Sequence, residues 1–405
     1  MHKIWTMPHP RKRHALSEIL RKLKFSRIVS IQGPRQCGKS FFARDLLSQE
    51  IESYAYQTLD IKGHRVFAQE NPASFLARFQ GLKTAAIDEA QKAPDLFDEI
   101  KAKVDIDPRP GQFLLLGSTE FSREVLVKES LTGRLSRIRM FPMNMAEAFE
   151  LKPSGLNETE WYRSKARVSR SDLMRFLKTG GFPGIFAVRS ELERDSKLHE
   201  WIEVTAFRDL NQFKTLKLDP EFAMELLEAI AQLENPDVGE IRSRVQRDLR
   251  VVTKHLNALS SLFAISKVSR HLLGTGKDRY ILCDPGLVLR LGGSFERALQ
   301  TWIYLELQSQ ASYQGRLGLK RKVHYFRSSK KSVVHFIIET PEAILLIYIH
   351  PEESWKDQDI RGLKACRDKF KRKSKKISIQ SLFLHGGSDT YTVDGIYFIP
   401  WECIA

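Results

Sequence analysis

Apolar and polar positions alternate in a strand-and-helix pattern through the first 140 residues of the chain. Short segments rich in apolar residues, such as 84–87 and 113–117, have the pattern of buried strands, and amphipathic stretches lie between them. Alternating strands and helices of this length predict an α/β fold, a parallel sheet with helices on both faces. The predicted strands are 27–32, 54–59, 84–87, 113–117 and 135–140, and the predicted helices include 14–24, 41–48, 72–79 and 96–104.

The pattern changes after Pro142. Residues 145–235 are mostly helical by periodicity, with a glycine-rich turn at 180–184, and residues 222–272 are predicted to form three short helices and a strand. A helix is then expected from about residue 295. The remaining predicted elements are strands at 323–327, 333–339 and 343–350, a basic helix at 359–373, and strands at 377–384 and 395–400.

The chain is too long for one ordinary domain, and the changes of pattern divide it. No apolar run approaches the roughly 18 residues of a membrane span, and the longest, 343–349, is predicted to be a buried strand. We therefore expect no membrane segment. The predicted domains are 1–150, a helical linker 151–221, 222–290 and 291–405.

One motif carries specific chemistry, the segment Gly33-Pro-Arg-Gln-Cys-Gly-Lys-Ser40, which matches G-x-x-x-x-G-K-[ST]. Glycines in such a loop let backbone N–H groups converge on phosphates, and the following helix adds its positive N-terminus. Lys39 is expected to reach the β- and γ-phosphates of ATP, and the Ser40 hydroxyl to bind Mg²⁺. The predicted nucleotide-binding residues are Gly33, Pro34, Arg35, Gln36, Cys37, Gly38, Lys39, Ser40 and Phe41.

An acidic pair follows the predicted strand 84–87. Asp88 is expected to hold Mg²⁺ through water, together with Ser40, and Glu89 to orient and polarise the attacking water. An acidic pair after a strand is a weak signal alone, but it becomes strong downstream of a phosphate-binding loop. A strand inserted between the two motifs is typical of ATPases that keep a catalytic Glu beside the magnesium Asp.

Two further residues are candidates for catalysis. The strand 113–117 leads into Ser118, whose side chain could sense the γ-phosphate. Arg134 is the candidate arginine finger, with Arg35 a helper. A structural ion pair is the alternative for Arg134. Whether Arg134 acts within its own chain or in trans stays open, and action in trans would require a homo-oligomer.

These motifs occur together in the order expected of the AAA-type ATPases that carry a DUF4143 domain, and the chain resembles this family along nearly its whole length. The resemblance implies a bacterial or archaeal P-loop ATPase with a winged-helix module and a C-terminal restriction-endonuclease-like domain. The segments that carry it are Gly33–Ser40, Leu59-Asp60, Asp88-Glu-Ala-Gln-Lys-Ala-Pro94, Gly117-Ser118, Glu129-Ser-Leu-Thr-Gly-Arg134, Gly180-Gly-Phe-Pro183, Arg208-Asp209 and Cys283-Asp-Pro-Gly-Leu287.

The resemblance makes 222–290 a winged helix, with 248–262 as its recognition helix. Apolar residues recur there at three- and four-residue spacing, and they are expected to be buried. The other face would present Arg250, Lys254 and His255 to DNA, although winged helices also serve as protein-contact modules. The residues expected to be buried are Leu249, Val252, Leu256 and Leu259.

The C-terminal segment departs from the family at the positions of its usual catalytic acids and lysine. Those positions are His335, Tyr348 and His350 here, which leaves Glu296 of the preceding helix without partners. Metal-dependent phosphodiester cleavage needs clustered oxygen ligands. We therefore expect a degenerate nuclease fold that does not cut. His335 and His350 could bind a transition metal, but structural histidines are the commoner reading.

Charge points to a polyanionic partner. The chain has 65 Lys and Arg against 49 Asp and Glu, a formal net charge of +16. The basic helix 359–373 extends this to Lys375 and Lys376, so DNA is the expected partner, contacted by Arg250, Lys254, Lys371, Arg372 and Lys373. A merely solubilising charge is the alternative. The four scattered cysteines lack metal-ligand spacing, and no signal segment is seen, which favours the cytoplasm.

The leading hypothesis is thus an ATPase that cleaves the β–γ phosphoanhydride and couples nucleotide state to DNA binding, with ATP and Mg²⁺ as cofactors. Two alternatives remain open. One is a nucleotide-controlled switch acting on a protein partner, for example in defence or toxin control. The other is a true nuclease, which the missing carboxylates argue against.

Overall fold

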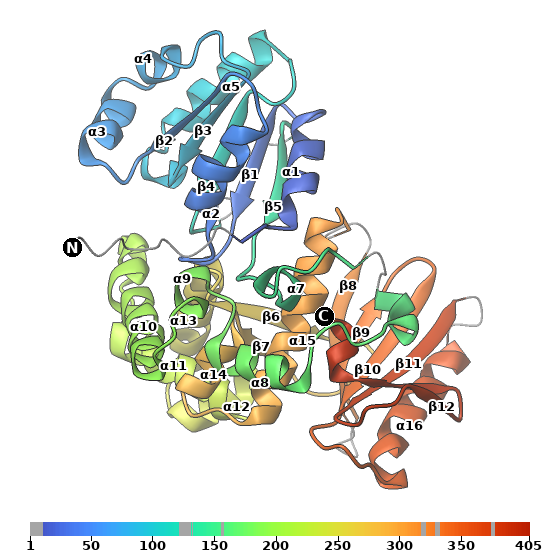
Figure 1. The fold of residues 1–405 in the computed structure, drawn as a ribbon. Helices are drawn as coiled ribbons and strands as arrows, with labels where there is room; N and C mark the ends of the chain where they lie inside the picture. Colours follow the sequence, from blue (N-terminus) through green and yellow to red (C-terminus); the bar gives the residue numbers. More distant parts are fainter. Residues whose placement is uncertain are drawn as a thin grey trace, which may run out of the picture. The chain divides into compact units, whose positions relative to one another are not determined.

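The structure, a computed structural model, describes residues 11–120, 131, 133–154, 158–316, 321–328, 333–373 and 377–405. It divides into two compact units, which are described separately (Figure 1). Unit 1 is Met1–Met143 with Ser261–Phe263 and Ser312–Gly315, and unit 2 is Asn144–Ser260, Ala264–Ala311 and Arg316–Ala405.

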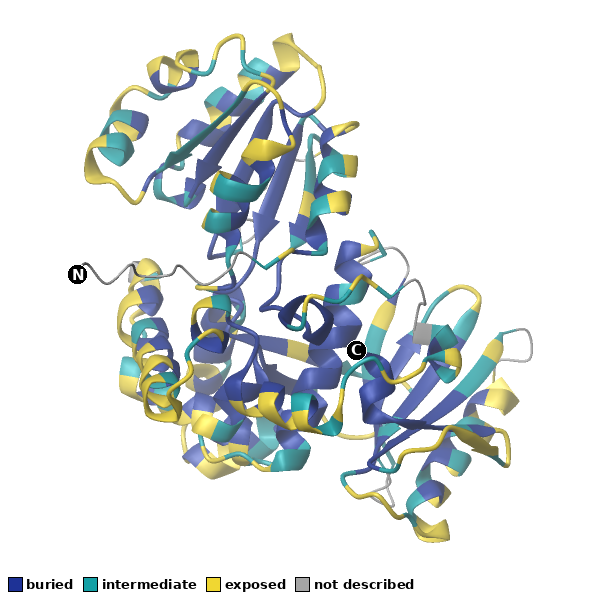
Figure 2. Ribbon diagram, viewed as in Figure 1, coloured by how far each residue is buried: buried dark blue, intermediate teal, exposed yellow. Residues whose placement is uncertain are grey.

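Unit 1 is built on a five-stranded sheet of order β2-β3-β4-β1-β5, in which every pairing is parallel. The central strands are buried along their lengths, whereas the edge strand β2 is only half-buried (Figure 2). This confirms the predicted parallel sheet. The strands are β1 (Ile28–Gln32), β2 (Tyr54–Thr58), β3 (Thr84–Asp88), β4 (Phe113–Gly117) and β5 (Leu135–Arg139).

Helices cover both faces of this sheet, as the alternating pattern predicts. Alternate residues of a strand point to opposite faces, so Ala85 and Ile87 of β3 face one layer while Ala86 and Asp88 face the other. The first layer contains α3 (Lys62–Glu70), α4 (Pro72–Ala77) and α5 (Leu96–Ile106), whose apolar side chains form one core with those strand residues. Helix α1 (Ala15–Leu23) contacts β1.

The helix after the glycine-rich loop differs from the prediction of one helix over 41–48. A short α2 (Lys39–Phe41) passes into a π-helical turn, Phe42–Leu46, and then a 3₁₀ turn, Leu47–Gln49. Such π-turns are rare and are often found at functional sites. Helix α3 was not among the predicted elements. This helix contains few apolar residues and is largely solvent-accessible, so it shows little of the apolar pattern from which the other helices were predicted.

Unit 2 begins with helices, as the periodicity after residue 142 predicts. Asn144 caps the first of them with a capping box that includes Glu147. Asp284 is buried and accepts hydrogen bonds from the backbone nitrogens of Gly181 and Gly286, which ties the glycine-rich turn to the start of α14. The helices are α7 (Met145–Ala148), α8 (Arg170–Thr179), α9 (Pro183–Phe186), α10 (Glu191–Glu203), α11 (Pro220–Gln232), α12 (Val238–Val245), α13 (Leu249–Ser261), α14 (Pro285–Arg290), α15 (Phe295–Tyr313) and α16 (Asp357–Lys373).

A mixed eight-stranded sheet of order β12-β13-β11-β10-β9-β8-β6-β7 forms the rest of unit 2. Helix α16 packs on β9, β10 and β11 through Ile360, Leu363, Cys366 and Phe370. The predicted C-terminal strands and basic helix are therefore present, with β12 in addition. The strands are β6 (Ile265–Arg270), β7 (Arg279–Leu282), β8 (Lys322–Arg327), β9 (Val333–Glu339), β10 (Ala343–Ile349), β11 (Ser378–His385), β12 (Tyr391–Val393) and β13 (Ile396–Pro400).

The segments 222–290 and 291–405, predicted as separate domains, share this one sheet. Ser269 and Arg270 of β6 pair in parallel with His324 and Tyr325 of β8. Because the pairing joins strands that are distant in sequence, no local pattern could reveal it. The boundary expected at 290 therefore does not coincide with a boundary between compact units.

Two side chains of α13 differ from the prediction in their burial. Leu249, the first residue of the helix, is 40% exposed, whereas Val252, Leu256 and Leu259 are fully buried as predicted. His255 is buried instead of exposed. Its Nε2 accepts a hydrogen bond from the Asp219 backbone nitrogen at 2.9 Å and its Nδ1 lies 2.8 Å from the Val251 carbonyl, and burial lowers its pKa.

Among the described residues no helix combines the length and the apolar character that crossing a membrane requires. The four cysteines, Cys37, Cys283, Cys366 and Cys403, are free thiols and all are buried.

Candidate functional site

The phosphate-binding loop connects β1 to α2 and has the backbone geometry that its glycines permit. A Cβ atom at Gly33 would lie 1.9 Å from the Met140 carbonyl oxygen, so no other residue fits there. Gly38 has a φ of 98°, which favours glycine, and Gln36 has a φ of 60°. The Met140 backbone nitrogen also donates to the Gln32 carbonyl at 2.7 Å. The end of β5 therefore shapes the start of the loop.

Lys39 lies within the loop and is almost fully buried. Its Nζ donates to the carbonyl oxygens of Gly33 and Pro34, both at 2.8 Å. Among the residues that the structure describes, the ammonium group pairs with no carboxylate, and it is held by two neutral carbonyls of the loop. An anion that enters the loop would give this positive charge a stronger partner.

The acidic pair lies at the carboxyl end of β3, and the loop lies at the carboxyl end of β1, so both are at the same end of the parallel sheet. In the sequence β2 separates the two motifs, as predicted, and in the sheet β4 lies between β1 and β3, the strands that precede them. Asp88 is 2% exposed, and its Oδ1 accepts from the Glu89 backbone nitrogen at 3.0 Å. Glu89 has a φ of 54°, an unusual value for a non-glycine residue, which turns the chain sharply after the strand.

Ser118 and Glu89, predicted separately, are in contact. The Ser118 hydroxyl at the end of β4 donates to Glu89 Oε2 at 3.0 Å, and Gln91 Nε2 donates to the same oxygen. Two donors therefore fix the orientation of this carboxylate. The sequence indicated Ser118 and Glu89, but it gave no sign that Gln91 would join them.

Tyr56 links the two predicted magnesium ligands. Its hydroxyl donates to Asp88 Oδ2 at 2.5 Å and lies near the Ser40 side chain. Burial, then the hydrogen bond to Asp88, raise the pKa of Tyr56, so the phenol stays protonated and remains a donor. Ser40 and Asp88 therefore lie within reach of one shared group. The sequence analysis missed Tyr56, because a tyrosine in an edge strand has no motif.

Arg13 was also missed. This arginine precedes α1 and is buried, and it donates from Nη1 to the Cys37 carbonyl at 2.6 Å and from Nη2 to the Phe141 carbonyl at 2.8 Å. Nη2 also lies 3.2 Å from the Tyr313 hydroxyl. Arg13 therefore ties the phosphate-binding loop to the segment after β5. The only sequence signal was its place in a basic N-terminal run.

Arg134 lies at the opposite end of the parallel strands from the phosphate-binding loop, and whether it acts as a finger in cis or in trans stays a prediction. It precedes β5, at the opposite sheet edge from Lys39, and its backbone carbonyl accepts from Ile28 at the start of β1. Its side chain forms a bidentate ion pair with Asp105 at 2.5 and 2.8 Å, which lowers the pKa of that carboxyl. Most of the motif before Arg134 lies outside the described residues, and action in trans stays a prediction.

The donor set of this site fits a magnesium–nucleotide complex. Mg²⁺ prefers oxygen ligands and keeps several waters, and the Ser40 hydroxyl and the buried Asp88 carboxylate are oxygen groups of this kind. Gly33 lets the loop start against the Met140 carbonyl, and Gly38 adopts a φ of 98°, so the backbone can turn as a phosphate-binding loop requires. The bound metal would supply positive charge to the β- and γ-phosphates.

Residues 25–149 match the family model of the AAA domain. Together with the parallel sheet and the loop geometry, this match identifies that part of the chain. Residues 25–149 form an AAA-type P-loop domain. The match covers less than half of the chain, so it describes this domain and not the segments after it.

Two curated relatives are similar over a longer stretch of the chain. Both are uncharacterized proteins, one from Mycobacterium bovis and one from Mycobacterium tuberculosis, each 25% identical over 301 residues. The aligned stretch is 71% of this chain but only 60% of each relative, so the chain spans less than two thirds of their length.

Solved structures give weaker likenesses. A Walker-type ATPase of Pyrococcus abyssi matches with a TM-score of 0.45 and 15% identity, over 70% of this chain and 98% of that one. A DNA polymerase III gamma subunit-related protein of Thermotoga maritima matches with a TM-score of 0.25 and 13% identity, over 62% and 98%. Scores this low carry no argument about function, and the AAA domain rests on its own sheet, loop and family match.

The predicted DNA-binding residues lie on two separate helices of unit 2, α13 and α16 (Figure 1). On α13 Arg250 is exposed, whereas Lys254 is partly buried and donates to the Lys217 carbonyl at 3.1 Å. On α16 Lys371, Arg372 and Lys373 are exposed and form no ion pair among the described residues.

Other cations of α16 are held within unit 2. Lys364 pairs with Asp394 at 2.5 Å, Arg367 donates to the Asp394 carbonyl, and Lys369 donates to the Leu273 carbonyl at 2.7 Å. Asp394 comes from the turn between β12 and β13, so the helix has an acidic neighbour that the local sequence does not show. Lys375 and Lys376 lie outside the described residues.

The two histidines that the sequence analysis considered as metal ligands, His335 and His350, are buried. His335 Nε2 is 3.8 Å from Glu296, and its Nδ1 accepts from the Ile349 backbone nitrogen at 3.0 Å. Burial, with nearby Arg279 and Arg297, lowers the pKa of His335 well below its usual value. His350 Nε2 lies 2.8 Å from the Ser354 carbonyl. Within the described ranges no three His, Cys, Asp or Glu residues are grouped to hold a metal ion.

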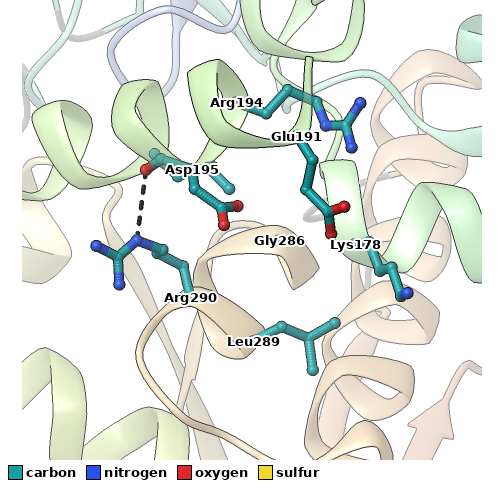
Figure 3. A pocket seen from close by; sticks show the side chains of 8 residues that line it. Lys178, Glu191, Arg194, Asp195, Gly286, Leu289 and Arg290 are labelled. Atoms are coloured by element: carbon teal, nitrogen blue, oxygen red, sulfur yellow. Dashed lines mark hydrogen bonds between the residues drawn. The ribbon is translucent and has the colours of Figure 1, made fainter. Parts of the chain in front are cut away.

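A cavity of about 310 Å³ opens in unit 2 between α8, α10 and α14 (Figure 3). Figure 3 shows the carboxylates of Glu191 and Asp195 and the side chains of Lys178, Arg194 and Arg290 around it. Most of these side chains are exposed, and both signs of charge are present. None of the residues that line it belongs to the AAA domain.

Proposed function

We propose that this chain hydrolyses ATP to ADP and phosphate at the AAA domain and couples nucleotide state to DNA binding by unit 2. One observation carries the hydrolysis proposal: Ser40, Asp88 and Glu89 lie at the carboxyl ends of the parallel strands. Tyr56 donates a hydrogen bond to Asp88 and lies near Ser40, and Glu89 follows Asp88 in a sharp turn. This is the arrangement of oxygen groups that a magnesium–ATP complex and an attacking water require.

The chain's residues divide the work as follows. Backbone N–H groups of 33–40 hold the phosphates, and Lys39 leaves the Gly33 and Pro34 carbonyls to contact the phosphate oxygens. Glu89, oriented by Ser118 and Gln91, accepts a proton from the water that attacks the γ-phosphate. The electrostatic stabilisation of the transition state comes from Lys39 and the loop amides.

The experiment compares the wild-type chain with Lys39→Ala and Glu89→Gln in ATP-binding and phosphate-release assays. Lys39→Ala is expected to weaken ATP binding, because it removes the buried charge of the loop. Glu89→Gln is expected to bind ATP normally and to lower turnover by about 10²–10⁴-fold, the contribution of a positioned general base. Phosphate release by Glu89→Gln at the wild-type rate would refute the assigned role of Glu89.

The DNA proposal is supported by the exposed cations Lys371, Arg372 and Lys373 at the end of α16 and by Arg250 on α13. Phosphate contacts by such residues make affinity fall as salt rises. Replacing Lys371, Arg372 and Lys373 together with Ala should weaken duplex binding and flatten its salt dependence. A matched control is Lys364→Ala, because Lys364 is already paired with Asp394. Duplex binding at low salt that is absent, or equal in the triple variant, would contradict this role and favour a protein partner.

A further inference from the structure

The Tyr56 side chain reaches a predicted magnesium ligand from the neighbouring strand. It lies in β2, and the register pairs Tyr56 with Ala86 and Thr58 with Asp88 of β3. Tyr56 and Asp88 are therefore diagonal neighbours on the same face of the sheet, and the long tyrosine side chain spans the gap between them. That face is the one that carries the helix after the phosphate-binding loop.

The hydroxyl group of Tyr56 donates its proton to Asp88 Oδ2 at 2.5 Å. Ser40 lies near enough to the same hydroxyl to lower the pKa of Tyr56, whereas burial and Asp88 raise it. Tyr56 is therefore hydrogen-bonded to one predicted magnesium ligand and is a neighbour of the other.

Asp88 keeps acceptor capacity for a metal despite this contact. Each carboxylate oxygen offers about two lone pairs, and the two oxygens accept one hydrogen bond each from Tyr56 and the Glu89 backbone nitrogen. Because Asp88 is almost fully buried, protein groups and not bulk water fix its rotation. The Tyr56 hydroxyl is one of the two donors that hold this carboxylate.

We propose that Tyr56 is a positioning residue of the magnesium site, which holds the Asp88 carboxylate in place near Ser40 before the metal arrives. This role rests on the proposed binding of magnesium–ATP. A ligand held in advance loses less freedom when the metal binds, so affinity rises without a further contact to the ion. Tyr56 supports the gain in ATP affinity that Mg²⁺ produces, and it does not support binding of the nucleotide without the metal.

Tyr54 provides a matched control within the same strand. It lies on the same face of β2, two residues earlier, and its hydroxyl donates to the Ala43 carbonyl at 2.8 Å in the π-helical turn. Tyr54→Phe and Tyr56→Phe each remove one oxygen atom from a partly buried tyrosine of β2. Only Tyr56→Phe removes a hydrogen bond to a predicted magnesium ligand.

The test measures equilibrium binding of the non-hydrolysable analogue AMP-PNP by calorimetry, once with EDTA and once with saturating Mg²⁺. For each chain the ratio of the two affinities gives the magnesium effect. A hydrogen bond to a charged group is worth enough to change this ratio by about tenfold. We expect Tyr56→Phe to lower the ratio by about tenfold with unchanged affinity in EDTA, and Tyr54→Phe to match the wild type. Thermal unfolding of both variants checks that they fold.

The outcomes separate this role from the proposed function. A wild-type chain whose affinity does not rise with Mg²⁺ refutes the magnesium site and, with it, the role of Tyr56. If the wild type gains affinity and Tyr56→Phe gains as much, only the positioning role is refuted. A larger gain in Tyr56→Phe also overturns it, because the hydroxyl would then compete with the metal. A loss of affinity in EDTA as well would make Tyr56 a structural residue of the loop.

Discussion

Arg13 is expected to control the order of the phosphate-binding loop, although it lies 20 residues before Gly33 in the sequence. The perturbation is Arg13→Met, which keeps the length of the side chain and removes its donors. The carbonyls of Cys37 and Phe141 then lose partners that lie at 2.6 and 2.8 Å. Both residues are buried, so water does not readily replace those donors.

The magnitude follows from the two carbonyls. A buried acceptor left without a partner costs roughly 1–3 kcal/mol, which gives roughly 2–6 kcal/mol for the pair. The wild type must also keep a guanidinium out of water, and the variant escapes that cost. We therefore expect a net loss near the lower end, about 2–3 kcal/mol, in the unit that contains the loop. Because the Cys37 carbonyl belongs to the loop, about half of this loss should appear as roughly tenfold weaker ATP binding.

The assay combines ATP-binding calorimetry with hydrogen exchange of peptides that cover residues 33–41. Arg13→Met should exchange faster in those peptides and bind ATP more weakly. The control is Lys12→Met, because Lys12 is the exposed neighbour and loses a charge of the same sign. If Arg13→Met does not fold, Arg13→Lys is the second variant. It keeps the positive charge and a single donor nitrogen, and it should show an intermediate effect. Wild-type exchange and affinity in a folded Arg13 variant would refute the reasoning.

Two further predictions concern pH and catalysis in trans. Full burial raises the pKa of Glu306, which accepts from the Met145 backbone nitrogen at 2.7 Å, from 4.5 to about 7. The folded chain therefore binds more protons than the unfolded chain between pH 4.5 and about 7. As the pH rises through that window, the free energy of unfolding should fall by on the order of 3 kcal/mol. Glu306→Gln should remove this slope in denaturation curves, and an unchanged slope would assign it to other groups. Arg134→Ala should leave ATP affinity unchanged, because Arg134 pairs with Asp105 at the opposite end of the strands from the loop. If Arg134 acts in trans, ATP turnover per chain should fall in this variant. It should then also fall when the wild type is diluted.

The sequence was sufficient wherever the determining pattern is contiguous. Residues 33–40 carry a loop geometry that depends on neighbouring glycines, and an apolar segment that ends in Asp88-Glu89 places both acids at a strand end. The five strands of unit 1 and β8, β9, β10, β11 and β13 of unit 2 were predicted within a residue or two, because period-two and wholly apolar patterns are local properties, whereas β7 and β12 were not predicted. These local patterns are sufficient to predict the AAA domain.

Tertiary structure decided the features that depend on residues distant in sequence. Tyr56 reaches Asp88 only because of the register of β2 on β3, and Arg13 reaches Cys37 only because the chain before α1 packs under the loop. The pairing of β6 with β8 and the ion pair of Arg134 are of the same kind. Side-chain partners of this type are set by strand register and chain packing, which no local pattern of residues encodes.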